Sequence, residues 1–523
     1  MITLLDYGAG NVRSVINAIE SLGERVQLVK RGEDILSAEK LVFPGVGAFG
    51  NMMEILNKRE FVAPLKAYLQ ADRPFLGICL GLQALFESSE EAPNVPGLRF
   101  IPGTVKRFSI DLSVPHIGWN GLNIHHASKL FVGLEGNEKF YFVHSYHVRP
   151  DTDDFVLTTT DYGYRFVSAI RKGNVTATQF HPEKSGKSGL SLLKNFLRNN
   201  AKTVMPPRIS ESTCLAKRII ACLDVRTNDR GDLVVTKGDQ YDVRENGDVR
   251  NLGKPVDLAR RYYEEGADEI TFLNITGFRD FPLEDIPMLD VLRKTSENVF
   301  VPLTIGGGIR EYTDKDGRTY TALDVAAKYF RSGADKISIG SDAVLIVEAY
   351  LKTGIKTGRS AIEEIARVYG NQAVVISVDP RRVYVKKPES VKHRVIKTEI
   401  PGPNGESYCW YQCTIKGGRE GRDLDAVTLA QVCEKLGAGE ILLNCIDRDG
   451  TGQGFDLELI NAVKEAVSIP VIASSGAGCA EHFLEVFKKT GAESALAAGI
   501  FHREEVPIGQ VKSELKGKVE VRV

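Results

Sequence analysis

A cysteine, a histidine and a glutamate in this sequence form a pattern that could support acyl transfer. Cys79 stands between Gly77 and Gly81 in GICLG, after the apolar run PFL. Gly-x-nucleophile-x-Gly is typical of a tight strand-to-helix turn, although a lone cysteine can equally be a small buried hydrophobe. His181 and Glu183 follow much later in QFHPE. Such a set supplies the nucleophile, base and orienting group of acyl transfer.

Further residues near the cysteine favour the same chemistry. Gln83 comes one helical turn after Cys79, so the two side chains share a helix face. The loop PGVGAFG (44–50) follows an apolar strand, and Gly45 and Gly47 leave backbone N–H groups open to hold an oxyanion. His181 alone would be interpreted as an ordinary structural histidine. The combination predicts a catalytic site at Cys79.

A pair of aspartates suggests proton transfer in the second half of the chain. Asp224 ends ACLDV (221–225) and Asp379 ends ISVDP (376–380), and IGGGIR (305–310) is similarly echoed by ASSGAG (473–478). This internal repeat predicts two related halves. Opposed carboxylates can act as general acid and general base when their environments separate their pKa values. The alternative is that both merely cap loops, but the twofold recurrence favours catalysis.

Glycine-rich strand ends predict two phosphate cradles. Small residues there expose backbone N–H groups, which bind phosphate. One lone glycine run usually marks only a turn, but two sets half a barrel apart predict a substrate with a phosphate at each end. The first set is Gly306, Gly307, Gly308, Gly340 and Ser341, and the second is Gly476, Gly478 and Gly499.

The elements that must position these residues fall into two series. Up to about residue 200 we expect buried parallel strands at 2–5, 41–43 and 75–78, helices at 12–22 and 82–88, and a strand-rich, mixed part with strands at 141–143, 166–170 and 175–179. A linker follows in NNAKTVMPPRISESTC (199–214), which has a Pro-Pro pair and no periodicity. We therefore predict domains at 1–200 and 215–523, joined by residues 201–214.

The second series predicts a (β/α)8 barrel, so the fold class is α/β. Eight apolar strands alternate with helical segments, at 218–223, 269–273, 301–305, 336–339, 373–378, 440–444, 470–474 and 494–497. Two hydrophilic stretches, 312–320 and about 384–412, are expected to be loop insertions.

Four charged residues stand at the starts of these strands, far from the predicted mouth: Arg218, Glu269, Lys336 and Glu440. Charges inside a barrel are unfavourable unless they are paired. The set predicts a structural ion-pair ring, side chains that simply point outward, or a polar gate at the end of an internal passage.

Composition narrows the classes of partner and compartment. The chain has 523 residues and a net charge of −1, which gives no electrostatic case for a nucleic acid or anionic membrane partner. Its eight cysteines include no CxxC pair, so we expect unpaired thiols, no metal site, and a reducing compartment. We expect the cytoplasm, or the plastid stroma if a transit peptide has been removed.

At this point the motifs are recognisable. PGVGAFG, GICLGLQ and QFHPEKS resemble the class I glutamine amidotransferases. LAKRIIACLDV, VTKGDQYD, IGGGIR, GADKISIGSDA, GAGEILLNCIDRDGTGQGFD and IASSGAG resemble the cyclase subunit of imidazole glycerol phosphate synthase. Together the halves resemble the fused eukaryotic-type enzyme family of histidine biosynthesis, over essentially the whole chain.

The resemblance implies that glutamine is hydrolysed through a thioester on Cys79 and that ammonia passes through the barrel. At the mouth it would convert phosphoribulosyl-formimino-aminoimidazole-carboxamide ribotide (PRFAR) into imidazole glycerol phosphate and aminoimidazole carboxamide ribotide (AICAR). Asp224 and Asp379 would be acid and base. The gate would be Arg218, Glu269, Lys336 and Glu440, and the further substrate-binding residues are Lys237, Asn444, Asp449 and Ser475. Lys184 is expected to pair with Asp335 across the domain interface.

We expect no cofactor and no metal. The resemblance also implies a monomer, because the fusion supplies the glutaminase in the same chain. Asn274 stands where bacterial cyclases have aspartate, so we assign it no proton transfer. Ser474-Ser475 replaces a double glycine, yet Ser475 can still donate to a phosphate. Two alternatives remain: a glutaminase feeding another barrel synthase, disfavoured because the strands end in aspartates and not in a Schiff-base lysine, and an inactive metabolite-binding scaffold, disfavoured because no catalytic residue is missing.

Overall fold

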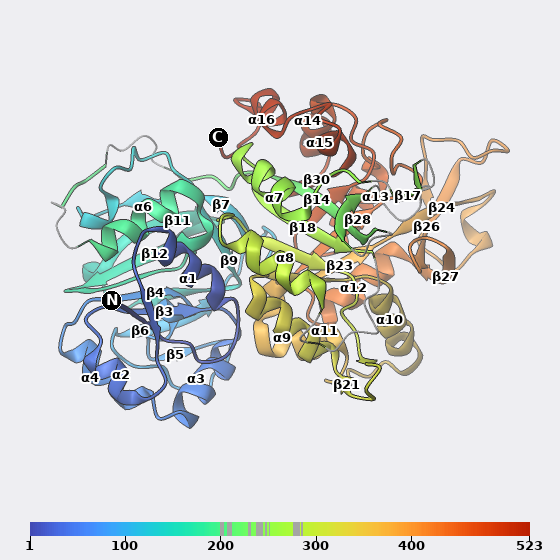
Figure 1. Ribbon diagram of the computed structural model, residues 1–523. Helices are drawn as coiled ribbons and strands as arrows, with labels where there is room; N and C mark the ends of the chain where they lie inside the picture. Colours follow the sequence, from blue (N-terminus) through green and yellow to red (C-terminus); the bar gives the residue numbers. More distant parts are fainter. Residues whose placement is uncertain are drawn as a thin grey trace.

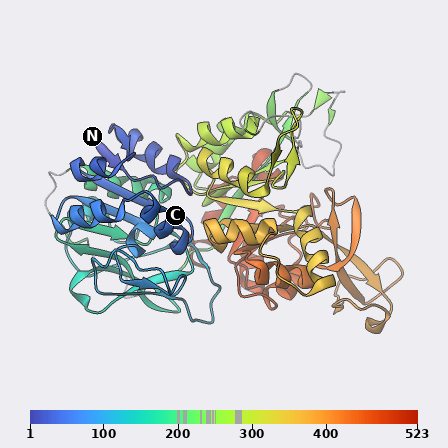
Figure 2. The ribbon, with the colours of Figure 1, turned by 90° about the horizontal axis from the view of Figure 1, so that it is seen from below.

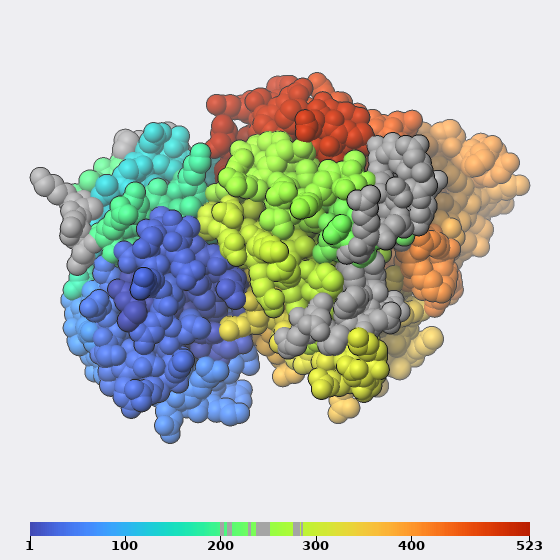
Figure 3. Space-filling view, viewed as in Figure 1, coloured from blue at the N-terminus to red at the C-terminus, as the bar shows by residue number. Residues whose placement is uncertain are grey.

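The computed structural model describes residues 1–198, 203–206, 212–228, 232–236, 244–245, 248–249, 251–275, 283 and 286–523. The N-terminal half, blue to green-cyan in Figure 1, lies beside the second half, green to red. Seen from below, the two halves meet along one face (Figure 2), and the space-filling view shows them touching along a seam (Figure 3).

A mixed 11-stranded sheet forms the N-terminal half. Its parallel part is ordered β2 (Val26–Leu28), β1 (Ile2–Leu4), β3 (Leu41–Gly45), β4 (Phe75–Cys79) and β13 (Val175–Thr178), and β12 (Tyr164–Lys172), β10 (Tyr146–Pro150) and β6 (Gly103–Arg107) continue it antiparallel. Strands β1, β3, β4 and β13 are buried along their whole length, as expected of parallel strands with both faces covered. β9 (Phe140–His144) pairs separately with β7 (His116–Asn120). The predicted strands of this half are confirmed.

Helices cover this sheet: α1 (Val12–Ser21), α2 (Gly32–Ser37), α3 (Phe49–Lys58), α4 (Val62–Gln70), α5 (Leu80–Gln83) and α6 (Gly186–Leu197). The helix predicted at 82–88 is wrong, because α5 ends at Gln83. The carbonyls of Ala84 and Leu85, which a longer helix would use, instead accept the N–H groups of Leu98 and Phe100, each at 2.8 Å. Hydrogen bonds from the segment 98–100 therefore end this helix.

The second half contains the predicted closed barrel of eight parallel strands. In order around the barrel they are β14 (Arg218–Thr227), β18 (Glu269–Asn274), β19 (Leu303–Gly306), β22 (Lys336–Ile339), β23 (Val374–Val378), β28 (Glu440–Asn444), β29 (Val471–Ser474) and β30 (Ser494–Ala497), and β30 pairs with β14 to close it. The surrounding helices are α7 (Pro255–Glu264), α8 (Pro287–Ser296), α9 (Ala322–Ser332), α10 (Ser341–Thr353), α11 (Ala361–Tyr369), α12 (Ala426–Leu436), α13 (Leu457–Lys464), α14 (Ala480–Lys489), α15 (Gly499–His502) and α16 (Ile508–Leu515).

Both hydrophilic insertions carry strands, contrary to the expectation of loops. The first is a hairpin of β20 (Tyr312–Thr313) and β21 (Thr319–Tyr320). The second is a four-stranded antiparallel sheet of β24 (Pro380–Val385), β25 (Ile396–Lys397), β26 (Tyr408–Ile415) and β27 (Glu420–Asp425). This sheet projects from the barrel on the side away from the N-terminal half (Figure 1).

The linker predicted at 201–214 falls partly outside the described residues. Helix α6 ends at Leu197 and strand β14 begins at Arg218. The exact domain boundaries therefore stay a prediction. Among the described residues no helix is long and apolar enough to cross a membrane.

Candidate active sites

Cys79 occupies a strained turn between β4 and α5. It has φ 53°, a left-handed conformation that a side chain adopts only at some energetic expense. The flanking glycines make the turn possible: a Cβ on Gly77 would lie 2.7 Å from the carbonyl oxygen of Gly81, and one on Gly81 would collide with the carbonyl oxygen of Phe43. The glycine spacing of the motif thus serves to present the Cys79 sulfur.

His181 is oriented by Glu183 and lies beside the cysteine. Its Nδ1 is 2.7 Å from Oε1 of Glu183, which leaves Nε2 for the sulfur of Cys79. Burial alone would lower the pKa of His181, but the Glu183 carboxylate and the Cys79 sulfur raise it well above its usual value. Gln179 donates its amide to the same sulfur at 3.4 Å. The three predicted residues therefore meet in one buried site.

The cavity beside Cys79 contains two further polar groups. Gln83 donates to the carbonyl of Tyr146 at 3.0 Å, and its Oε1 is buried with no protein partner among the described residues. Glu91 also lines the cavity, accepts the N–H of Phe49 at 2.8 Å, and has its pKa raised by burial. Sequence reasoning missed Glu91, because SSEEAP carries no motif. The cavity measures only about 40 Å³, enough for a few waters, so its walls must move to admit an amino acid.

The predicted oxyanion loop lies against the barrel. Gly45 and Gly47 line the cavity, and the intervening carbonyl of Val46 accepts the hydroxyl of Tyr7 at 2.6 Å. The N–H of Ala48 donates to the carbonyl of Val368, at the end of α11, at 3.2 Å. The conformation of this loop is therefore set partly by the other half of the chain.

The predicted interface pair is present. Lys184 Nζ lies 2.7 Å from Oδ2 of Asp335, and the Lys184 side chain is 3% exposed. Asp335 also accepts the amide of Asn11 at 2.8 Å and the N–H of Leu303 at 2.8 Å. This carboxylate therefore ties the glutaminase-like half to the start of strand β22.

The four predicted gate residues form one closed ionic ring in the barrel floor. Arg218 contacts Glu269 at 2.8 Å and also contacts Glu440, while Lys336 lies 2.7 Å from Glu269 and 2.6 Å from Glu440. All four side chains are at most 1% exposed. Two positive and two negative groups balance, which offsets much of the unfavourable desolvation.

The ring has the Cys79 cavity on one side and apolar side chains on the other. Tyr141 lines the Cys79 cavity, its hydroxyl is buried without a described partner, and burial together with Glu269 raises its pKa well above the usual value. On the other side, the barrel interior is filled by the apolar cluster Ile220, Cys222, Val375, Leu442, Ile472 and Leu496. The ring therefore separates the first cavity from an apolar barrel interior.

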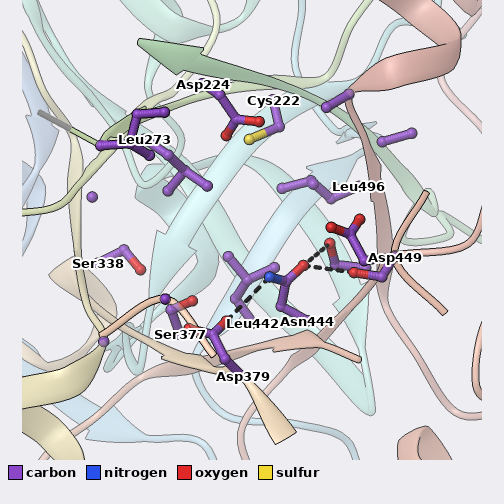
Figure 4. Close-up of a pocket in the computed structure, with 18 of the residues that line it drawn as sticks. Cys222, Asp224, Leu273, Ser338, Ser377, Asp379, Leu442, Asn444, Asp449 and Leu496 are labelled. Carbon is purple, nitrogen blue, oxygen red and sulfur yellow. Dashed lines mark hydrogen bonds between the residues drawn. The ribbon is translucent and has the colours of Figure 1, made fainter. Parts of the chain in front are cut away.

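The mouth of the barrel holds a second cavity of about 600 Å³. Asp224 and Asp379 face each other across it, and Asp449 lies to one side (Figure 4). Burial and the nearby Asp449 charge raise the pKa of Asp379, although a hydrogen bond from Asn444 opposes the shift. A raised pKa suits a carboxylic acid that must donate a proton.

The first predicted cradle lies at the ends of β19 and β22. Gly306, Gly307, Gly308 and Ser341 all line the cavity. Gly307 has φ 93° and Gly308 has φ 74°. The Ser341 hydroxyl accepts the N–H of Lys416 at 3.1 Å, and the next residue, Gly417, also lines the cavity. The insertion sheet thus contributes its β26–β27 turn to this cradle, which the sequence did not indicate.

The second predicted cradle lies at the ends of β29 and β30. Ser475, Gly476, Gly478 and Gly499 line the cavity. Ser475 has φ 71°. Its hydroxyl donates to the side-chain oxygen of Asn444 at 2.7 Å. The N–H of Gly478 donates to Nδ1 of His482 at 3.1 Å.

Lys237 lies outside the described residues. Asn444 lines the cavity, but its polar atoms bind Asp379, Ser474 and Ser475. Among the described residues no cluster of histidine, cysteine and carboxylate side chains could hold a metal ion.

The sequence is similar to known proteins over its whole length. The class I glutamine amidotransferase family matches residues 3–200, and the histidine biosynthesis protein family matches residues 218–507. The chain is 60% identical to the chloroplastic imidazole glycerol phosphate synthase hisHF of Arabidopsis thaliana, covering 100% of this chain and 90% of that protein. It is 56% identical to hisHF of Schizosaccharomyces pombe, covering 98% of each. The HisF subunit of Methanosphaera stadtmanae is 45% identical and matches 58% of this chain.

Proposed function

Because this chain belongs to the bifunctional imidazole glycerol phosphate synthases of histidine biosynthesis, we propose how its residues divide the two activities. The N-terminal half hydrolyses glutamine to glutamate and ammonia. The barrel combines that ammonia with PRFAR to form imidazole glycerol phosphate and AICAR. The observation that carries the proposal is the placement of the ionic ring between the Cys79 cavity and the apolar interior of the barrel.

In the glutaminase half, the Cys79 thiolate attacks the carboxamide carbon of glutamine. The protonated Nε2 of His181 gives its proton to the departing ammonia, and Glu183 holds Nδ1. Water then attacks the thioester, with His181 as base, and releases glutamate. Backbone N–H groups of the 45–47 loop stabilise the oxyanion. The free Oε1 of Gln83 and the Glu91 carboxylate suit the amino group of the bound glutamine.

Ammonia then passes from the Cys79 cavity through the barrel. Tyr141 lies at the entrance, and the ring of Arg218, Glu269, Lys336 and Glu440 must open to let it through. Beyond the ring, the apolar interior suits a small neutral molecule and keeps ammonia from protonation by bulk water.

At the mouth, ammonia attacks the ribulosyl carbonyl of PRFAR, and ring closure and cleavage follow. Asp379, with its raised pKa, is the general acid, and Asp224 is the general base. The two glycine cradles hold the terminal phosphates, and Lys237 is a further substrate-binding residue. Glutamine and PRFAR are thus the partners. We also propose a monomer without a nucleic acid partner, in the cytoplasm or the plastid stroma.

The decisive test is Cys79→Ala, assayed for imidazole glycerol phosphate with glutamine and, separately, with an ammonium salt at high pH. We expect activity with ammonium and none with glutamine, because only the first half needs the thiol. Ser88→Ala, outside both cavities, serves as the control.

Product formation from glutamine by the variant would refute the role of Cys79. If the wild-type protein formed no product from either nitrogen source, the barrel assignment would fail. A different barrel synthase or an inactive scaffold would then be the better explanation.

A further inference from the structure

The barrel mouth has one arginine beside each phosphate cradle. Among the described residues that line the cavity, the cationic side chains are Arg310 and Arg503. Arg310 follows the glycines at the end of β19, and Arg503 follows α15 at the end of β30. Backbone N–H groups alone supply no full counter-charge to a phosphate dianion. The planar guanidinium fork is the side chain best matched to one.

The Arg503 fork is oriented by Glu505. Its Nε lies 2.6 Å from Oε1 and its Nη2 lies 2.9 Å from Oε2 of Glu505. The intervening Glu504 has φ 56°, a left-handed conformation that turns the chain back. Glu505 therefore binds the edge of the guanidinium formed by Nε and Nη2. The edge formed by Nη1 and Nη2 does not face Glu505.

The remaining edge of Arg503 reaches the second cradle. Nη1 lies 2.8 Å from the position that a Cβ on residue 499 would take. The guanidinium thus lies against the side of residue 499 where a larger residue would carry its side chain. Gly499 itself lines the cavity with Ser475, Gly476 and Gly478. Nη1 therefore lies beside Gly499, and Arg503 lines the same cavity as the cradle.

We propose that Arg503 binds the substrate phosphate of the second cradle through its Nη1–Nη2 edge, while Glu505 holds the opposite edge. This inference rests on the proposed function, because it assumes a phosphate at that cradle. Arg503 contacts a part of the substrate that does not react. Its contribution is therefore the same in the ground state and the transition state, and its loss raises KM more than it lowers kcat.

The test is Arg503→Gln in the intact protein, assayed with ammonium so that glutamine hydrolysis plays no part. We expect the KM for PRFAR to rise about 10- to 100-fold, with kcat within about threefold of the wild type. Arg503→Lys keeps the charge without the fork and should recover part of the loss. Arg394→Gln is the matched control, since Arg394 lies in the insertion, is similarly exposed, at 45%, and pairs with Glu465 at the end of α13.

Product inhibition separates a ligand of one cradle from general damage. Imidazole glycerol phosphate and AICAR each carry one phosphate, so Arg503→Gln should weaken inhibition by one product and leave the other unchanged. An unchanged KM, or equal weakening for both products, would overturn the role of Arg503 while leaving the proposed function intact. A wild-type protein that does not turn over PRFAR would overturn the proposed function itself.

Discussion

Asn444 donates its side-chain amide to Oδ1 of Asp379 at 3.1 Å. The oxygen of the same amide lies 2.7 Å from the Ser475 hydroxyl and 3.2 Å from that of Ser474. Because an ionised carboxylate only accepts hydrogen bonds, the amide nitrogen faces Asp379, and the amide oxygen accepts from both serine hydroxyls. One side chain thus connects the acid proposed for the cyclase reaction to the cradle proposed for a phosphate (Figure 4).

Asn444→Ala should shift the pH dependence of the cyclase. The amide bond lowers the pKa of Asp379 against burial and the Asp449 charge, so its removal lets that pKa rise further. An acid with a higher pKa stays protonated to higher pH. The descending limb of kcat/KM should therefore move upward, measured with the concentration of free ammonia held constant at each pH.

Two comparisons make this result specific. Asn444→Asp places a like charge beside Asp379 and should move the limb in the same direction. Asn461→Ala removes a half-buried asparagine on α13, outside both cavities, and should leave the profile unchanged. A lower rate with an unmoved limb would show that Asn444 only supports the local packing.

Glu183→Gln should disable the glutaminase and spare the cyclase. The Glu183 carboxylate raises the pKa of His181, so the neutral amide lets that pKa fall and weakens the fixed orientation of the imidazole. We expect glutamine-dependent turnover to drop about 10²- to 10⁴-fold. Ammonium-dependent turnover of the same preparation is the internal control. A parallel loss of both activities would indicate misfolding or a role for Glu183 outside the triad.

Much of the fold could be predicted because each parallel strand is a short apolar run buried on both faces. The predicted start at Glu269 and end at Asn444, for example, coincide with β18 and β28. The stretch 384–412 was mistaken for a loop because β25, the strand wholly inside it, has only two residues, neither fully buried, and β26 begins only at Tyr408. The length of α5 depends on hydrogen bonds from residues 98–100, which no local pattern records.

The candidate-site residues likewise fall into those that a local motif predicts and those that only the folded chain brings together. Cys79, His181 and Glu183 belong to compact motifs, because the strained turn demands glycines at fixed spacing and the histidine and glutamate are two residues apart. Glu91 and Arg503 reach their cavities only through the path of the folded chain. The link from Asn444 to Asp379 depends on side-chain orientation across two neighbouring strands, so the sequence placed both at the mouth without indicating their contact.

The stability of the protein should depend on the balance of positive and negative charges in the ionic ring. Lys336→Met removes one of two positive groups and leaves Glu440 and Glu269 with an uncompensated buried charge, which typically destabilises a protein by about 3–5 kcal/mol. We expect a lower midpoint of urea unfolding for the barrel. Lys336→Met combined with Glu440→Gln removes one charge of each sign and should recover most of that loss.

The same variants test the gate. Wild-type protein should release one glutamate for each imidazole glycerol phosphate, because ammonia has a single route through the ring. Both the single and the double variant leave the ring incomplete, so each should release more glutamate than imidazole glycerol phosphate. Only the single variant is expected to be strongly destabilised, so the double variant separates the gate from stability. Lys352→Met, at an exposed position on α10, is the control. A one-to-one ratio in the double variant would mean that the ring is a structural element and that ammonia reaches the mouth without passing it.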